Sequence, residues 1–259
     1  MTDNDVLHPL ETLEAAAKRC APAQDVWLLP PRREEARLEL SWEDGAAALT
    51  LAADWQGLLL LDRVEVSVVA GALPFQPVRL EAFSKLLAFV DEAKADEARD
   101  ADAPASEARC AQLPLVDLAA WQDRKRCEYW FLLQVLTPSP AFAALLALLR
   151  RSESYWLVRF LLAQSACGDK LQALGERYGV SYSHFRRLCR HALGNAAKTE
   201  LRDWRMARSL LDVAEGRENL TQVALKHGYA SSSHFSNEIK GLIGVSPRGL
   251  SNIIQLATK

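Results

Sequence analysis

Short runs of alternating apolar and polar residues occur in the first third of the chain. Residues 37–40 (RLEL) and 64–68 (VEVSV) repeat with a period of two, which is typical of strands with one buried face. Asp44-Gly45 and Gln56-Gly57 are pairs that favour hairpin turns between such runs. We therefore expect a small antiparallel sheet here, too short to close into a full barrel.

The pattern then changes to a helical period. Residues 78–94 carry apolar side chains at the spacing of one helix face, which predicts an amphipathic helix. Residues 91–110 contain no large apolar side chain and carry 7 acids against 3 bases, so we expect a loop or the fraying end of a helix. The helical period returns over residues 118–162, and the prolines of TPSP (137–140) predict a break between two or three packed helices.

The last part of the chain contains one pattern twice. The tripeptide SHF occurs in GVSYSHFRRLCRHALG and again in GYASSSHFSNEIKGLIG, and the residues around it correspond at identical offsets apart from one extra residue in the second turn. The corresponding residues of the first copy are Leu171, Leu174, Gly175, Tyr178, Gly179, Phe185, Cys189, Leu193 and Gly194. Those of the second copy are Leu220, Val223, Ala224, His227, Gly228, Phe235, Ile239, Ile243 and Gly244.

Each copy has the physical features of a helix-turn-helix. A small residue lies where the second helix must approach the first, a glycine permits the left-handed backbone that ends the first helix, and a serine can cap the second. In the first copy these residues are Gly175, Gly179 and Ser181; in the second they are Ala224, Gly228 and either Ser231 or Ser232. Residues 198–214 predict a linker helix that packs against both copies.

The exposed face of the second helix of such a motif enters the major groove of DNA. Arginine can bind guanine, and asparagine adenine, through two hydrogen bonds, whereas serine and lysine suit phosphates or single base contacts. The candidate DNA-binding residues are Ser183, Arg186, Arg187 and Arg190 in the first copy, and Ser232, Ser233, Ser236, Asn237 and Lys240 in the second. The alternative is that they form only a solvated face. If they bind DNA, we expect the arginine-rich first copy to dominate affinity and the second to adjust position.

The charge distribution favours the DNA interpretation. Residues 151–259 hold 16 Lys and Arg against 9 Asp and Glu, while residues 1–150 hold 15 against 24, so a net charge of −2 conceals a basic and an acidic part. A basic part is suited to a polyanion such as double-stranded DNA.

Other classes of protein have little support in the sequence. Five scattered cysteines without a C-x-x-C pair indicate reduced thiols, and the histidines lack companions for a metal site, so we expect no metal and no cofactor. No catalytic motif is present, so an enzyme is not expected. No apolar run has the length of a membrane span, and the acidic start differs from a secretory signal, which predicts a cytoplasmic protein.

The doubled motif, above all HGYASSSHFSNEIKGLIGVSP, resembles the DNA-binding domain of the AraC/XylS family of bacterial transcription regulators. The matching signature positions are Phe235, Lys240, Gly244 and Pro247. The segments WQDRKRCEYWF, TPSPAF, SESYWLV, LLAQS, YGVSYSHFRRLC and SPRGLSNIIQLA resemble, more closely, the InvF-type activators of type III secretion genes. The resemblance covers the chain from about residue 75 to its end.

The resemblance implies a cytoplasmic activator that binds promoter DNA and helps to recruit RNA polymerase. It also implies a type III secretion chaperone of the tetratricopeptide class as co-activator, and a homodimer is possible. The alternative is a protein-interaction adaptor with weak or non-specific DNA binding, in which residues 141–164 offer a groove to a partner.

The expected fold class is α+β: a small N-terminal antiparallel sheet with helices, followed by an all-α domain of two helix-turn-helix units joined by a linker helix. We expect an N-terminal regulatory or partner domain over residues 1–110, of which residues 91–110 form an acidic linker. Connecting helices are expected over residues 111–164, and the DNA-binding domain over residues 165–259.

Overall fold

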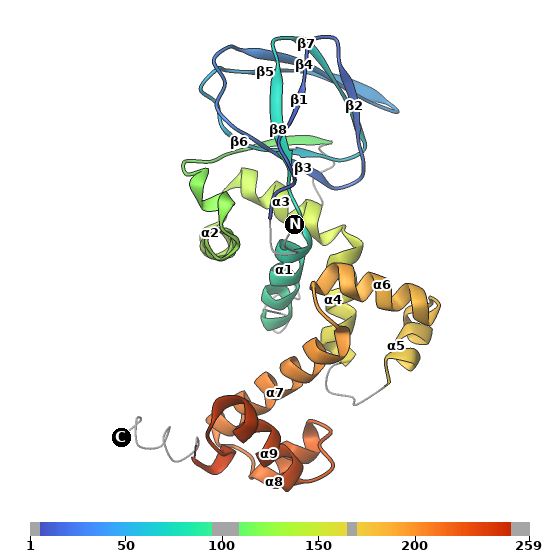
Figure 1. The fold of residues 1–259 in the computed structure, drawn as a ribbon, viewed down its shortest axis with the longest axis vertical. Helices are drawn as coiled ribbons and strands as arrows, with labels where there is room; N and C mark the ends of the chain where they lie inside the picture. The colour runs from blue at the N-terminus through green and yellow to red at the C-terminus, as the bar shows by residue number, and fades with distance from the viewer. Residues whose placement is uncertain (1–5, 95–108, 165–169, 250–259) are drawn as a thin grey trace. The chain divides into compact units, whose positions relative to one another are not determined.

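The structure is a computed structural model that describes residues 6–94, 109–164 and 170–249 (Figure 1). The chain divides into two compact units, Met1–Trp156 and Leu157–Lys259. The division falls inside the segment for which we expected connecting helices, within the helix α4 (Glu153–Gln164). The predicted class, an antiparallel sheet with helices followed by an all-α part, is confirmed.

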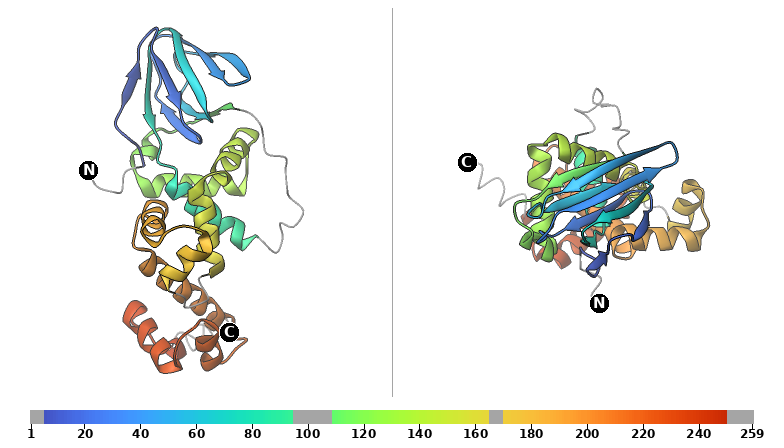
Figure 2. Two further views of the ribbon diagram at one scale, coloured as in Figure 1. Left: turned by 90° about the vertical axis from the view of Figure 1, so that its right-hand side faces the viewer. Right: turned by 90° about the horizontal axis from the view of Figure 1, so that it is seen from above.

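The first unit contains two antiparallel sheets (Figure 2). One has the strand order β1-β8-β3-β6-β9 and the other the order β2-β7-β4-β5. The strands are β1 (Glu11–Leu13), β2 (Lys18–Ala21), β3 (Asp25–Leu29), β4 (Ala36–Trp42), β5 (Gly45–Leu51), β6 (Gly57–Leu61), β7 (Val64–Ala70), β8 (Leu73–Pro77) and β9 (Cys110–Pro114). The β-structure is thus larger than the small sheet we expected, and the expectation of a short sheet is wrong.

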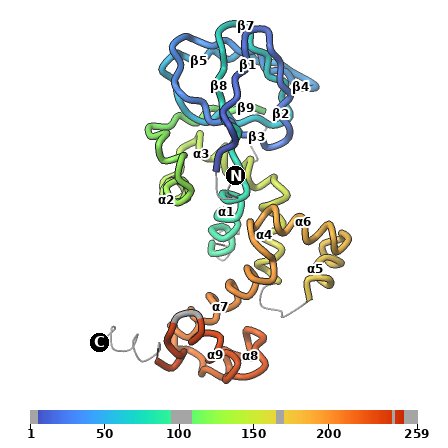
Figure 3. The backbone as a smooth tube through the Cα atoms, viewed as in Figure 1, coloured from blue at the N-terminus to red at the C-terminus, as the bar shows by residue number. Residues whose placement is uncertain are grey.

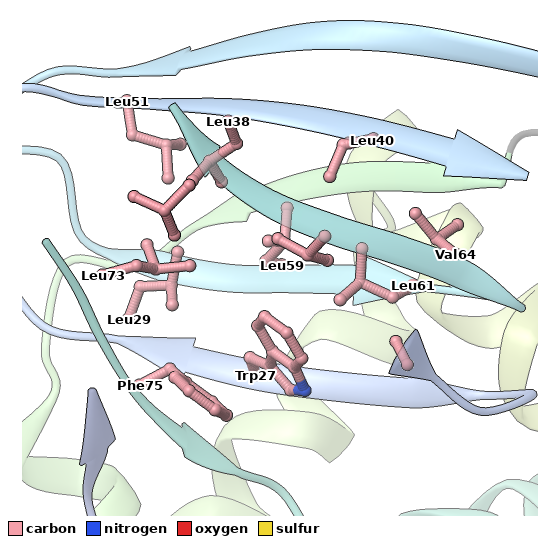
Figure 4. Packing of buried hydrophobic residues seen from close by; sticks show 13 residues of the cluster. Trp27, Leu29, Leu38, Leu40, Leu51, Leu59, Leu61, Val64, Leu73 and Phe75 are labelled. Carbon is pink, nitrogen blue, oxygen red and sulfur yellow. The ribbon is translucent and has the colours of Figure 1, made fainter. Parts of the chain in front are cut away.

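The side chains between the two sheets form a continuous apolar core (Figure 4). Trp27 and Phe75 stack at a ring distance of 4.2 Å in the first sheet. Leu38 and Leu40 from the facing sheet are 2% exposed and belong to the same cluster. Burial of this many apolar side chains is the main source of stability for a two-layer β-structure.

Three helices and a short 3-10 helix accompany the sheets. They are α1 (Glu81–Ala93), η1 (Ala119–Gln122), α2 (Arg124–Leu136) and α3 (Pro140–Arg150). Helix α3 contacts β6 and β9, and α1 contacts α2 and α3, so these helices cover the outer face of the five-stranded sheet. Every residue of β6 (GLLLL) is buried because that strand has the core on one face and helices on the other.

The predicted strands and helices of this unit are confirmed with one exception. The runs at 37–40 and 64–68 lie in β4 and β7, the turn at Asp44 joins β4 to β5, and α1 and the TPSP break lie as expected. The prediction of a hairpin turn at Gln56-Gly57 is wrong, because β6 pairs with β3 and β9 and not with β5. Most of the acidic linker, residues 95–108, lies outside the described residues.

In the described ranges, no single helix is long and apolar enough to cross a membrane. Helices α2 and α3 together meet that test of length and composition, as a pair bent by 112° at their break.

The cysteines give a test of the packing. Cys20 is exposed, and Cys167 lies outside the described residues. Burial raises the pKa of Cys110 and Cys189 to about 11 and that of Cys127 to about 12. Because the thiolate is the nucleophile, we expect iodoacetamide at about pH 8 to label Cys20 in the folded protein and the three other thiols only after unfolding. Peptide mass spectrometry measures this, and equal labelling of Cys189 and Cys20 in the folded protein would contradict the packing.

The described residues of the second unit form helices joined by turns, without a strand (Figure 3). It contains the end of α4 followed by α5 (Leu171–Tyr178), α6 (Tyr182–Leu193), α7 (Ala197–Glu215), α8 (Leu220–Lys226) and α9 (Ser232–Ile243). The predicted linker helix is confirmed in α7, whose 19 residues give a length of roughly 28 Å.

Candidate DNA interface

The first helix-turn-helix consists of α5 and α6. Gly179 ends α5 with a left-handed φ of +85°, and the Ser181 hydroxyl caps α6 by accepting a hydrogen bond from the backbone N–H of His184 at 3.4 Å. A Cβ added at Gly175 would lie 3.2 Å from the Cβ of Phe185, so a larger residue would force the two helices apart. The predicted turn glycine, serine cap and close approach are all confirmed.

The second helix-turn-helix consists of α8 and α9. Asn219 caps α8 through hydrogen bonds to its side chain, and Gly228 adopts a left-handed φ of +71° in the turn. Ser231 caps α9 by accepting a hydrogen bond from the backbone N–H of His234 at 3.1 Å. Of the two serines that we considered as caps, Ser231 therefore has this role and Ser232 is the first residue of the helix.

The residues predicted to face inward are buried. Phe185, Cys189 and Leu193 are at most 3% exposed on α6, and Phe235 and Ile239 are fully buried on α9. The side chain of Ile243, predicted as their companion, lies outside the described residues. In the second motif this stripe packs on α7 in a cluster that includes Met206, Val213, Val223, Ala224 and Tyr229.

The end of α4 is part of the DNA-binding unit. The ring of Phe160 lies 5.1 Å from that of Tyr178 and 6.4 Å from that of Phe185. The Arg208 guanidinium on α7 donates a hydrogen bond to the Leu162 carbonyl at 3.0 Å. The compact unit therefore begins at Leu157, ahead of residue 165, where we placed the start of the DNA-binding domain.

All four candidate residues of α6 lie on its exposed face. Ser183, Arg186, Arg187 and Arg190 are exposed, and the Arg186 guanidinium lies over the ring of Tyr182 at 5.7 Å. In the ranges that the structure describes, no carboxylate forms an ion pair with these three arginines. The face therefore presents three uncompensated positive charges within two helical turns, an arrangement suited to a phosphate backbone and to guanine edges.

The candidate residues of α9 are less uniform. Ser233, Asn237 and Lys240 are exposed, whereas Ser232 and Ser236 are half-buried. The structure thus brings three of the five candidates onto one polar face with a single positive charge. The two half-buried serines have less surface available for a groove contact.

Sequence reasoning missed a charged contact that fixes α9 to α7. Glu238 lies 3.7 Å from the Arg202 guanidinium and 4.0 Å from that of Arg205. Arg205 also lies over the ring of Tyr229 at 4.8 Å. Because Glu238 is turned toward α7, the acid on the second recognition helix is directed away from the exposed Asn237 and Lys240 face. The sequence contains no local signal for this contact, because its partners are more than 30 residues apart.

His227 lies in a buried polar cluster. His227 is 5% exposed, and its Nε2 lies 2.7 Å from the Asp212 carboxylate, which also pairs with Lys226 at 2.9 Å. Burial alone raises the pKa of Asp212, but hydrogen bonds from His227 and Lys226 outweigh it, so the pKa lies below the usual value. The cluster links the end of α8 to α7. Among the described residues no group of three or more metal-ligating side chains occurs.

The structure has two helix-turn-helix motifs joined by one continuous helix, and the second helix of each motif has an exposed polar face. This arrangement defines a sequence-specific DNA-binding module of transcription regulators. The family described as "Helix-turn-helix domain" matches residues 174–252. The chain is 59% identical over 202 residues to the invasion protein InvF of Salmonella typhi, covering 78% of this chain and 92% of that protein. The chain belongs to the AraC/XylS family, in its InvF-type branch.

A second relative is the transcriptional regulator MxiE of Shigella flexneri. It is 47% identical over 116 residues, which cover 44% of this chain and 55% of that protein. Among solved structures, ToxT of Vibrio cholerae covers 95% of this chain at 8% identity with a TM-score of 0.36. An AraC-type regulator from Chromobacterium violaceum covers 38% at 20% identity with a TM-score of 0.35.

Proposed function

We propose that this protein activates transcription of type III secretion genes by binding promoter DNA through both helix-turn-helix motifs. The observation that carries the proposal is the exposed face of α6, where Arg186, Arg187 and Arg190 have no acidic partner among the described residues. The helix that carries these arginines is capped at its start and held in place by a buried apolar stripe. Such a helix, with arginines and no carboxylates on its exposed face, is suited to a DNA groove. Family membership supports the same function.

Within this proposal, the two recognition helices have different tasks. Arg186, Arg187 and Arg190 bind guanine edges and phosphates, with Ser183 on a phosphate near the start of the helix. Asn237 suits an adenine, and Lys240 with the serines Ser232, Ser233 and Ser236 suits the backbone. The first motif then supplies most of the affinity, and the second adjusts the position of the protein on its site.

The partners follow from the proposed activity. RNA polymerase is the machinery that an activator recruits, and a type III secretion chaperone of the tetratricopeptide class is the co-activator. The first unit, with its acidic surface charge, is the part that we assign to the chaperone. The protein acts in the cytoplasm, needs no cofactor and carries out no enzymatic reaction.

Footprinting at different salt concentrations tests the DNA proposal. On a promoter of type III secretion genes we expect protection of two adjacent major grooves on one side of the duplex. The logarithm of the binding constant should fall with the logarithm of salt concentration by about 0.9 per phosphate contact. Addition of the purified chaperone should raise transcription in vitro. A response that is flat in salt, or equal binding to a shuffled promoter, would contradict the proposal.

The alternative of an adaptor with incidental DNA binding is not favoured. The segment 141–164 was its strongest support, yet Phe142, Leu145, Leu148 and Leu149 are at most 3% exposed within the first unit. These side chains form core and offer no groove.

A further inference from the structure

A charged cluster joins the linker helix α7 to the second helix-turn-helix. Arg205 of α7 lies at its centre, with its guanidinium over the Tyr229 ring at 4.8 Å and 4.0 Å from the Glu238 carboxylate. Arg202, three residues earlier on α7, lies 3.7 Å from the same carboxylate. The cluster therefore connects α7 both to the turn of the second motif and to its recognition helix α9.

The two central side chains are largely buried and meet through their charges. The side chains of Arg205 and Glu238 are 21% and 20% exposed. Arg205 Nε and Glu238 Oε2 are buried and have no hydrogen-bond partner among the residues that the structure describes. The distances of 3.7 and 4.0 Å to the two guanidinium groups are longer than a hydrogen bond, so attraction between opposite charges holds the carboxylate.

Tyr229 extends the contact to the start of α9. It is 3% exposed, and its ring lies 4.9 Å from that of Phe235 and 5.7 Å from that of His234. Burial and the negative charge of Glu238 raise the pKa of the Tyr229 phenol, as expected for a phenol close to that carboxylate. Arg205 thus acts on α9 in two ways, directly through Glu238 and indirectly through Tyr229.

The first recognition helix has no such acid. Helix α6 (YSHFRRLCRHAL) contains no aspartate or glutamate. At the offset that aligns the two motifs, the half-buried Leu188 occupies the position of Glu238. A contact in which the recognition helix supplies the carboxylate is therefore a property of the second motif and not of the first.

This contact adds direction to the packing of α9. Burial of Phe235 and Ile239 anchors the helix, but the hydrophobic effect is not directional and permits small shifts along the core. Opposite charges at fixed positions favour one placement. Asn237 and Lys240, on either side of Glu238 in the chain, are exposed on the same helix, and a base contact through two hydrogen bonds tolerates little displacement.

We infer that Glu238 and Arg205 are positioning residues that set the base preference of the second recognition helix without touching DNA themselves. The inference rests on the proposed DNA-binding function and adds to it which residues determine specificity in one part of the site. Neutralisation of Glu238 should relax the base preference of α9. The base preference of α6 should stay as in wild type, because α6 lacks the contact.

Hydrogen exchange of the free full chain tests the positioning step without DNA. In Glu238→Gln, which keeps the shape of the side chain, the amides of α9 should exchange about threefold faster or more, and those of α6 should not change. Arg205→Gln should act in the same direction. The double variant should exchange little faster than Arg205→Gln alone, because the two residues share one contact.

Glu215→Gln is the matched control. It removes one negative charge from the end of α7, where the Glu215 side chain is 53% exposed, and should leave exchange in α9 at the wild-type rate. Arg202→Gln removes the more exposed partner of Glu238, with a side chain 52% exposed, and should give a smaller change than Glu238→Gln in the same direction. All these variants should unfold near the wild-type temperature.

Selection of DNA sites from a random pool tests the specificity step. Wild type should select two blocks of bases, and Asn237→Ala should identify the block that α9 reads. In Glu238→Gln the preference for the selected base over others in that block should fall by about fivefold or more. The block read by α6 should be retained, and the salt slope should stay constant because no phosphate contact is removed.

The two measurements separate failure of the inference from failure of the proposed function. Wild-type exchange of α9 in both Glu238→Gln and Arg205→Gln would overturn the inference even if the protein binds DNA as proposed. Faster exchange with an unchanged α9 block would also overturn it, because the contact would then stabilise α9 without influencing base preference. A wild type that selects no sequence would overturn the proposed function and the inference together.

Discussion

Replacement of Phe185 by alanine is expected to lower the free energy of unfolding of the second unit by about 3–5 kcal/mol. Phe185 is fully buried, and its ring lies 5.8 Å from that of Tyr178 and 6.4 Å from that of Phe160. Its Cβ also forms the close contact to Gly175 that holds α6 against α5. A loss of this size is a large share of the about 5–15 kcal/mol that stabilises a domain, so DNA binding should fail with it.

Chemical denaturation followed by helical circular dichroism measures this loss, with the affinity for promoter DNA measured beside it. Leu211→Ala is the control, because Leu211 is 63% exposed on α7 and its truncation should change stability by less than about 0.5 kcal/mol. If Phe185→Ala unfolds at the wild-type denaturant concentration, the packing of the first motif is wrong.

The same packing decides where a DNA-binding fragment must begin. A fragment that starts at residue 157 keeps Phe160 and the Leu162 carbonyl that Arg208 binds, whereas one that starts at residue 165 loses both. The shorter fragment should therefore resemble Phe185→Ala in stability. Equal stability of the two fragments would mean that α4 does not contribute to the unit.

The helical part of the fold was predictable because its signals are local. Gly179 and Gly228, the serine caps and the i, i+4, i+8 apolar stripe each depend on residues within one or two helical turns. Repetition of all these signals at matching offsets made the interpretation more specific than either copy alone.

The sheets were less predictable for a physical reason. Alternation reveals only strands with one solvated face, such as β4 and β7. Strands β3 (DVWLL) and β6 (GLLLL) are buried on both faces because helices cover the second face, so they lack the alternating period. Strand β9 returns to the sheet after the acidic segment, and no local pattern predicts that β6 is its neighbour.

In the candidate interface too, some features were predictable from local sequence and others depend on tertiary packing. Exposure of Arg186, Arg187 and Arg190 follows from helical period once Phe185 is assigned to the core. The contacts of Glu238 with Arg202 and Arg205 depend on how α9 meets α7, which is a tertiary arrangement.

Removal of the exposed arginines of α6 is expected to lower DNA affinity more than removal of the exposed polar residues of α9. The variant Arg186→Ala, Arg187→Ala, Arg190→Ala loses three exposed cations, each worth about 1–3 kcal/mol if its contact is bidentate to a base. Its affinity should fall by more than about a hundredfold, because even the lower figure sums to about 3 kcal/mol. The salt slope should also decrease by about 0.9 for each phosphate contact removed.

The variant Ser233→Ala, Asn237→Ala, Lys240→Ala is the comparison on α9. It removes one cation, so it should change the salt slope by about one contact or less and lower affinity less than the arginine variant. Arg217→Ala is the charge control, because Arg217 lies between α7 and α8 with its side chain 82% exposed and should leave the affinity nearly unchanged. Equal losses of affinity in the two triple variants would contradict this prediction. The two additional positive charges on α6 would then add nothing to the affinity, and both helices would contribute equally.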